Sequence, residues 1–185
     1  IQHKGKIKGM PRKNGWYVDA NAFYKAWPIS DLSVVFEERD FIHPKETIGI
    51  ELSRGCKFAC AFCNFPILGV KEDTTRDLDQ LAVELKRNYD LYGITNYSIA
   101  DETFNDRDEK IAKLGEIVKN IGFELNFTAF IRADILISRP QQLELLAEAR
   151  VWGHYYGIET LNHETGKVIG KGLHPDKMKA GLLNI

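Results

Sequence analysis

Cysteine is scarce in this sequence of 185 residues, and all three cysteines lie between positions 56 and 63. A disulfide framework is disfavoured, because the count is odd and Cys60 and Cys63 lie close together in the sequence. A structural zinc site usually takes its ligands from two separated pairs, and no second cysteine pair exists here. The nearest histidine, His43, lies upstream beyond Pro44. The candidate chemistry is therefore concentrated in one short segment.

Long apolar runs are also absent, since none approaches the roughly 18 residues that a membrane span requires. Basic residues are not in excess: 25 Lys and Arg face 26 Asp and Glu, which gives a net charge of −1. A general nucleic-acid-binding surface is therefore not indicated. Neither phosphate-binding motif, G-x-G-x-x-G or G-x-x-x-x-G-K-[ST], occurs. We expect a cytoplasmic location, because no targeting segment is visible and the thiols must stay reduced.

The cysteines are spaced C-x3-C-x2-C, at Cys56, Cys60 and Cys63. Three thiolates on one loop can hold an iron–sulfur cluster through three irons, which leaves the fourth iron open to a substrate or cofactor. A zinc site and inert buried thiols are the other interpretations. Residues 54–57 make the loop polar and flexible, unlike a core segment. Two functions other than catalysis remain, an iron–sulfur electron-transfer protein and a small zinc-binding interaction module. An electron carrier would need a fourth ligand, which no further cysteine supplies.

From position 47 onward, strand patterns alternate with helix patterns. The expected strands are 47–52, 96–100, 124–131 and 154–158. The expected helices follow the apolar spacing in 78–89, 111–121 and 143–149, and a fourth begins at Pro175. This alternation predicts an α/β fold with parallel βαβ units. Residues 1–46 show no persistent period, and we interpret them as an N-terminal extension or linker.

Polar residues follow each expected strand. The first strand leads to the cysteines, the second to Asp101, Glu102 and Thr103, the third to Arg132 and Asp134, and the fourth to Glu159 and Thr160. In (β/α) barrels the site forms at the carboxyl ends of several strands, whereas a doubly wound sheet concentrates it at one switch point. The distribution over four strand ends favours a barrel-like sheet. Taken singly, each of these residues also has a structural explanation, as a helix cap, an ion pair or a solvated charge.

The cysteine segment resembles the signature of the radical S-adenosylmethionine (radical SAM) superfamily, C-x3-C-x2-C with an aromatic residue, here Phe62, before the last cysteine. The lead-in at 50–55 resembles the cobalamin-dependent and methylthiotransferase-like branches. The resemblance covers residues 47–185 and implies a core domain built as a partial (β/α)6 TIM-like barrel. About four βα units of that barrel are present, which implies a domain truncated at its C-terminal end.

The resemblance also implies roles for individual residues. Cys56, Cys60 and Cys63 would hold a [4Fe–4S] cluster, and the backbone around Phe62 would approach adenine. Asp101 and Glu102 stand where the family often has Gly-Gly-Glu, the segment that binds the amino group of S-adenosylmethionine. Glu159 matches the acidic residue that holds the ribose hydroxyls. Arg132 is placed to meet the methionine carboxylate or the substrate.

The implied reaction is that of a radical SAM enzyme. The reduced cluster cleaves S-adenosylmethionine to methionine and a 5′-deoxyadenosyl radical, which abstracts hydrogen from an unknown substrate. The implied partners are that substrate and an electron donor, which is a reductase, a flavodoxin or a ferredoxin. Cobalamin is a further cofactor of the resembled branch, and no part of this chain supports its binding. Neither a membrane nor a nucleic acid is an expected partner.

Overall fold

The computed structural model describes residues 2–4, 12–13, 16–18, 33–63, 74–171 and 173–185. Its strands are β1 (Gln2–Lys4), β2 (Arg12–Lys13), β3 (Trp16–Val18), β4 (Thr47–Ile50), β5 (Ser53–Arg54), β6 (Thr74–Thr75), β7 (Asn96–Ile99), β8 (Asn126–Ile131) and β9 (Val151–Tyr156). Its helices are α2 (Leu78–Tyr92), α3 (Asp108–Asn120), α4 (Ala133–Ser138), α5 (Gln142–Glu148), α6 (His163–Ile169) and α7 (Pro175–Leu182), with short 3-10 turns η2 (Glu38–Asp40) and η3 (Phe104–Asp106). No helix in these ranges is long and apolar enough to cross a membrane.

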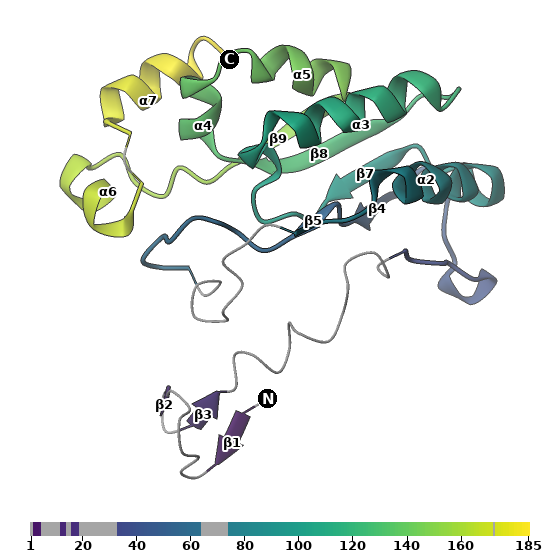
Figure 1. The fold of residues 1–185 in the computed structure, drawn as a ribbon, viewed down its shortest axis with the longest axis horizontal. Helices are drawn as coiled ribbons and strands as arrows, with labels where there is room; N and C mark the ends of the chain where they lie inside the picture. The colour runs from purple at the N-terminus through teal and green to yellow at the C-terminus, as the bar shows by residue number, and fades with distance from the viewer. Residues whose placement is uncertain (1, 5–11, 14–15, 19–32, 64–73, 172) are drawn as a thin grey trace.

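The central element is a four-stranded parallel sheet in the order β4-β7-β8-β9. Each new strand is added beside the previous one, and the order never reverses. A doubly wound sheet would reverse its order at a switch point, whereas sequential addition is how a barrel wall is built. The expected α/β fold with about four βα units is therefore confirmed (Figure 1).

Burial alternates along the strands, because successive side chains point to opposite faces of a sheet. On β8, Phe127, Ala129 and Ile131 are buried, whereas Phe130 between them is 51% exposed. The buried residues join one hydrophobic core with the apolar sides of the helices. Figure 1 shows α3 and α5 lying along β8 and β9 on that side. The opposite face of the sheet carries Phe130 and is the inner face of the partial barrel.

Helix ends follow local sequence signals. Helix α2 begins after Asp77, whose side chain accepts a hydrogen bond from the backbone N–H of Asp79, and it ends at Gly93 with φ +68°. Helix α7 has Pro175 in its first turn, as predicted. These capping residues and Pro175 lie at the helix ends that the structure shows.

The structure corrects three of the sequence expectations. The fourth strand is Val151–Tyr156, not 154–158, because a register shift lets it pair with β8 from Phe127 onward. The short helices α4 and α6 were not expected: the apolar residues of α4 are mostly consecutive, and α6 has only Val168 and Ile169 at its end, so neither displays a helical period. Residues 1–45 showed no persistent strand pattern in the sequence, but β1, β2 and β3 form a three-stranded antiparallel sheet within them. Strands of two or three residues are too short to show an alternating pattern.

Candidate functional site

The cysteine loop leaves the sheet through β5 and a glycine turn. Gly55 has φ +100°, a conformation that residues with a Cβ rarely adopt. Strand β5 pairs with β6 in antiparallel fashion, so the chain returns beside its own departure point. Within the loop, the Cys63 N–H donates to the Cys60 carbonyl oxygen at 3.0 Å. All three cysteine side chains are free of disulfides and half-buried.

The end of α6 supports this loop from the far part of the chain. The Ala61 N–H donates to the Ile169 carbonyl oxygen at 3.1 Å. Gly170 has φ +78°, and a Cβ built on it would lie 3.6 Å from the Ala59 carbonyl oxygen and 3.7 Å from the Cys60 Cα. The segment after β9 is therefore part of the cysteine site, although it is remote in sequence.

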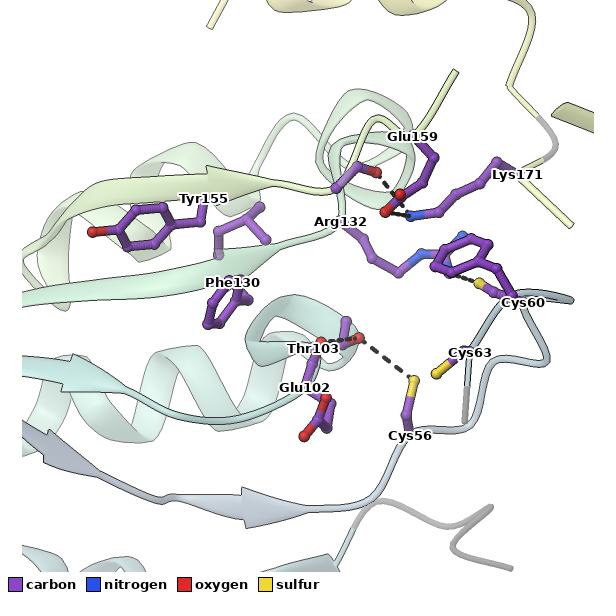
Figure 2. Close-up of a pocket in the computed structure, with 13 residues that line it drawn as sticks. Cys56, Cys60, Cys63, Glu102, Thr103, Phe130, Arg132, Tyr155, Glu159 and Lys171 are labelled. Atoms are coloured by element: carbon purple, nitrogen blue, oxygen red, sulfur yellow. Dashed lines mark hydrogen bonds and ion pairs between the residues drawn. The ribbon is translucent and has the colours of Figure 1, made fainter. Parts of the chain in front are cut away.

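A cavity of about 240 Å³ joins the cysteine loop to the carboxyl ends of three strands (Figure 2). Seven of the eight residues predicted for the site line it, and only Asp101 does not. The full lining is Cys56, Cys60, Phe62, Cys63, Glu102, Thr103, Phe130, Ile131, Arg132, Tyr155, Gly157, Glu159 and Lys171. The structure thus brings together side chains that the sequence places on five separate segments.

Arg132 lies directly after β8 and reaches the cysteine loop. Its Nη1 donates to Cys60 Sγ at 3.4 Å, and its guanidinium carbon lies 3.8 Å from the centre of the Phe58 ring. Its Nε and Nη2 donate to the two carboxylate oxygens of Asp134 at 3.0 and 2.5 Å. Burial raises the pKa of Asp134, but the Arg132 guanidinium outweighs this and holds that pKa below its usual range. The pair is therefore ionised at neutral pH.

Asp101 and Glu102 are neighbours with different surroundings. Asp101 is buried and accepts hydrogen bonds from the backbone N–H groups of Leu52 and Ser53, at 2.8 and 2.9 Å. Its second oxygen accepts from Ser53 Oγ and lies 3.5 Å from Lys110 Nζ. Glu102 instead faces the cavity, and its pKa is raised, first by burial and then by the negative charges of Asp101 and Glu51. A cationic ligand group beside Glu102 would relieve this cost.

Glu159 stands at the opposite edge of the cavity in a left-handed backbone conformation, with φ +63°. Its carboxylate lies 3.8 Å from Lys171 Nζ, which also donates to the Gly157 carbonyl oxygen at 2.8 Å. A Cβ on Gly157 would lie 3.0 Å from Glu159 Oε1, so glycine leaves room for this carboxylate. Glu159 follows β9 by three positions, not directly as the sequence analysis expected.

Six lining residues were not among the predicted site residues: Thr103, Phe130, Ile131, Tyr155, Gly157 and Lys171. The Thr103 hydroxyl lies 3.6 Å from Cys56 Sγ; the strand-end argument placed Thr103 at this edge but gave it no role. The rings of Phe130 and Tyr155 lie 5.4 Å apart, and Phe130 is out of phase with its buried neighbours in the alternating pattern. Lys171 lies twelve positions after Glu159, and the chain returns through α6 to bring it to the site.

The donors suit a cluster with several metal atoms. In the described part of the chain, no three His, Cys, Asp or Glu side chains gather around a single ion position. A [4Fe–4S] cluster places each thiolate on a different iron, so its ligands need not converge on one point. The three thiols face one cavity beside two cationic side chains, and cations stabilise thiolates. The residues present therefore fit this group.

Relatives with related sequences are methyltransferases by name. One is an uncharacterised methyltransferase of Pyrococcus horikoshii, 26% identical over 125 residues, which are 68% of this chain and 27% of the relative. Another is the hopanoid C-2 methylase of Rhodopseudomonas palustris, 31% identical over 116 residues, or 60% of this chain and 22% of the relative. The chain thus spans about a quarter of the length of these curated relatives.

Two solved structures share the fold. The cobalamin-dependent S-adenosylmethionine radical enzyme OxsB superposes with a TM-score of 0.61 and 19% identity, over 74% of this chain and 21% of that protein. The radical S-adenosylmethionine methyltransferase TsrM from Kitasatospora setae superposes with a TM-score of 0.62 and 16% identity, over 75% of this chain and 28% of that protein. The family model described as the Radical SAM superfamily matches residues 50–185, which include every residue of the cavity, and this chain therefore belongs to the radical SAM superfamily.

Proposed function

We propose that this chain forms the S-adenosylmethionine-cleaving site of a radical SAM methyltransferase. One observation carries the proposal: three thiols of a single loop share a cavity with two carboxylates and two cations at the carboxyl ends of parallel strands. S-adenosylmethionine carries an ammonium group, a sulfonium group, a carboxylate and ribose hydroxyls. The cavity carboxylates suit the ammonium group and the ribose hydroxyls.

Cys56, Cys60 and Cys63 would hold the [4Fe–4S] cluster as thiolates. When bound, the cluster supplies one electron to the sulfonium of S-adenosylmethionine, and the S–C5′ bond breaks. Glu102 would accept a hydrogen bond from the ammonium group of the methionine moiety. The pKa of Glu102 is raised, so its ionised form is destabilised in the free protein, and a nearby cation would stabilise that form. Glu159 would accept hydrogen bonds from the ribose hydroxyls, and Phe62 would lie beside adenine. Asp101 would act indirectly, by holding the backbone of residues 52 and 53 below the loop.

Methyl transfer is the reaction outcome that the similar proteins favour. Two of the curated relatives are a methyltransferase and a methylase by name, and OxsB and TsrM are solved with cobalamin. We infer that the full protein transfers a methyl group and uses cobalamin bound by residues outside this chain. Methyl donation leaves S-adenosylhomocysteine, whereas reductive cleavage leaves methionine and 5′-deoxyadenosine. Chromatography of the products with and without added cobalamin separates the two outcomes.

The electron-transfer and zinc interpretations make different demands on the chain. An electron carrier would need a fourth ligand, and no fourth cysteine exists in the sequence. A zinc module would bind zinc in stoichiometric amount and would leave the cavity carboxylates without a role. Neither accounts for Glu102 and Glu159 facing the cysteine loop across one cavity.

Anaerobic reconstitution with iron and sulfide tests the proposal. We expect a [4Fe–4S] cluster whose electron paramagnetic resonance signal changes when S-adenosylmethionine is added. Substitution of any one cysteine by alanine removes the signal, because two thiolates hold the cluster poorly. Ser138→Ala, on the exposed side of α4, serves as the control and retains the signal. Stoichiometric zinc without a cluster contradicts the proposal.

A further inference from the structure

Arg132 is held in place before any ligand enters the cavity. Its backbone N–H donates to Asn105 Oδ1 at 2.8 Å, and its carbonyl oxygen accepts from Asn105 Nδ2 at 3.1 Å. Asn105 also donates to the buried Gln142, at 3.1 Å. These contacts tie the end of β8 to η3 and α5. The position from which the Arg132 side chain starts is therefore fixed by three elements.

The guanidinium group has one face and one edge already engaged. Asp134 takes the edge formed by Nε and Nη2 in a two-point contact, and the Phe58 ring covers one face. The side chain is only 10% exposed. What remains is Nη1, which points at Cys60 Sγ (Figure 2). A two-point contact between Arg132 and a ligand carboxylate would require Asp134 to be displaced.

We propose that Arg132 is a positioning residue for the cluster, whose Nη1–H donates to the Cys60 sulfur and raises the reduction potential of the cluster. The inference rests on the proposed function, because it requires Cys60 to be a cluster ligand. It assigns Arg132 to the cluster sulfur and not to the methionine carboxylate or the substrate.

The physical argument is electrostatic. Reduction adds one negative charge to the cluster and its thiolates, and hydrogen bonds to the sulfurs are one of the factors that set cluster potentials. Asp134 neutralises the net charge of Arg132, so the pair acts as a dipole with its positive end at Cys60. The Arg132 side chain is largely shielded from water, where such a dipole acts more strongly than in solvent. The dipole favours the reduced cluster.

The potential of the reconstituted protein, measured without S-adenosylmethionine, tests the inference. In Arg132→Met the ratio of reduced to oxidised cluster at a fixed potential falls about tenfold, which equals about 59 mV for a one-electron couple. Arg132→Lys retains the cation but lacks the planar fork, so its potential lies between those of Arg132→Met and the wild type. Arg139→Met removes the same charge from an exposed position that contacts Asp108, and its potential stays at the wild-type value.

The measured dissociation constant of S-adenosylmethionine separates the two assignments. Equal potentials in the wild type and both Arg132 variants overturn the inference, and a weakened affinity would then assign Arg132 to the ligand. If the Arg132→Met protein holds no cluster, the Arg132→Lys potential decides by the same criterion. Absence of a cluster in the wild type is a distinct result that overturns the proposed function itself.

Discussion

At the scale of single residues, Glu159 lines the cavity and has a strained backbone conformation. A non-glycine residue with φ +63° bears a conformational cost of about 1–3 kcal/mol, and such residues cluster at functional sites. The surrounding structure maintains this conformation: Lys171 contacts the carboxylate, and Gly157 leaves room for it. The left-handed backbone at Glu159 therefore turns the chain after β9 and directs the Glu159 carboxylate to the cavity.

Substitution of Glu159 tests its proposed role toward ribose. In Glu159→Gln the affinity for S-adenosylmethionine falls about tenfold to over a hundredfold, because a hydrogen bond to a charged acceptor contributes about 1.5–3 kcal/mol. Isothermal titration calorimetry of the reconstituted protein measures this, and the cluster absorbance stays unchanged. Glu164→Gln is the matched control, since Glu164 is exposed on α6 and contacts only Lys167 in the described residues. An unchanged affinity would assign Glu159 to a structural role.

Glu102 leads to a pH dependence of ligand binding. Its pKa in the free protein is raised by burial and by Asp101 and Glu51, and a bound ammonium group favours the ionised form and lowers that pKa. Affinity is therefore constant above the free-state pKa and falls as the pH drops through it, by up to about tenfold per pH unit. Dissociation constants measured across the acidic range test this. Glu102→Gln binds more weakly, and its affinity is less dependent on pH; a wild type without this dependence contradicts the assignment.

The pair at 101 and 102 illustrates what sequence can and cannot decide. The strand-end argument selects both residues, because both follow the expected strand 96–100, whereas β7 ends at Ile99. Which of them faces the cavity depends on Ser53, whose backbone and hydroxyl engage Asp101 from a segment remote in sequence. Lys171 is a stronger case, since only the return of the chain through α6 brings it to Glu159. Residue types were predictable here, and their partners were not.

At the scale of elements, a buried ionic network joins α3 to the cysteine loop. Lys110 Nζ lies 2.9 Å from Asp106 Oδ1 and 2.8 Å from Ser53 Oγ, and it donates to the Thr103 carbonyl oxygen at 3.3 Å. Lys57, inside the cysteine loop, donates to the Asp106 carbonyl oxygen at 2.9 Å. One ammonium group thus links β5, η3 and α3 beneath the site.

Removal of this ammonium group should destabilise the domain. Lys110→Met leaves Asp101 and Asp106 buried without it, and loss of one partner of a buried ionic pair costs about 3–5 kcal/mol. Urea unfolding monitored by circular dichroism measures the loss, and we expect less iron per chain after reconstitution. Lys113→Met, one turn along α3 and partly exposed, changes the free energy of unfolding by about 1 kcal/mol or less. Equal stability of the two variants contradicts a structural role for the network.

Elements were predictable from sequence where their apolar residues recur at a regular spacing. Helices α2 and α3 carry apolar residues at helical spacing over several turns, and their identification was correct. Strand β9 was misplaced because Val151 and Trp152 precede a register shift that no local pattern reveals. Helix α5, with seven residues, was identified from its spacing, whereas α4 has consecutive apolar residues and α6 has apolar side chains only at Val168 and Ile169.

At the scale of the whole molecule, the parallel sheet ends at β4 and at β9, and neither has a second sheet neighbour within the described residues. Exposed strand edges pair with other chains, and bulky apolar residues near them aggravate this. Trp152 lies on β9 at the register shift and is 61% exposed. We therefore expect residues 1–185, produced alone, to self-associate.

A charge on the edge strand should suppress this association. Trp152→Lys shifts the elution of the isolated chain toward the monomer on size-exclusion chromatography, because lysine on an edge disfavours strand addition. Val83→Lys is a matched control, since Val83 is also 61% exposed but lies on α2, away from the sheet edge. A monomeric wild-type chain, or equal effects of both substitutions, contradicts the edge explanation.

The contact between Ala61 and Ile169 has a consequence for how the protein matures. A ribosome makes the cysteines well before it makes the segment that supports them. At synthesis rates of about 5–20 residues per second, the interval from Cys63 to Gly170 lasts about 5–20 s. During that time the cysteine loop lacks its contact with the end of α6, and the three thiols can be oxidised or can bind another metal. Cluster delivery is therefore best timed after residue 170 has emerged, which makes insertion a late event in the life of the nascent chain.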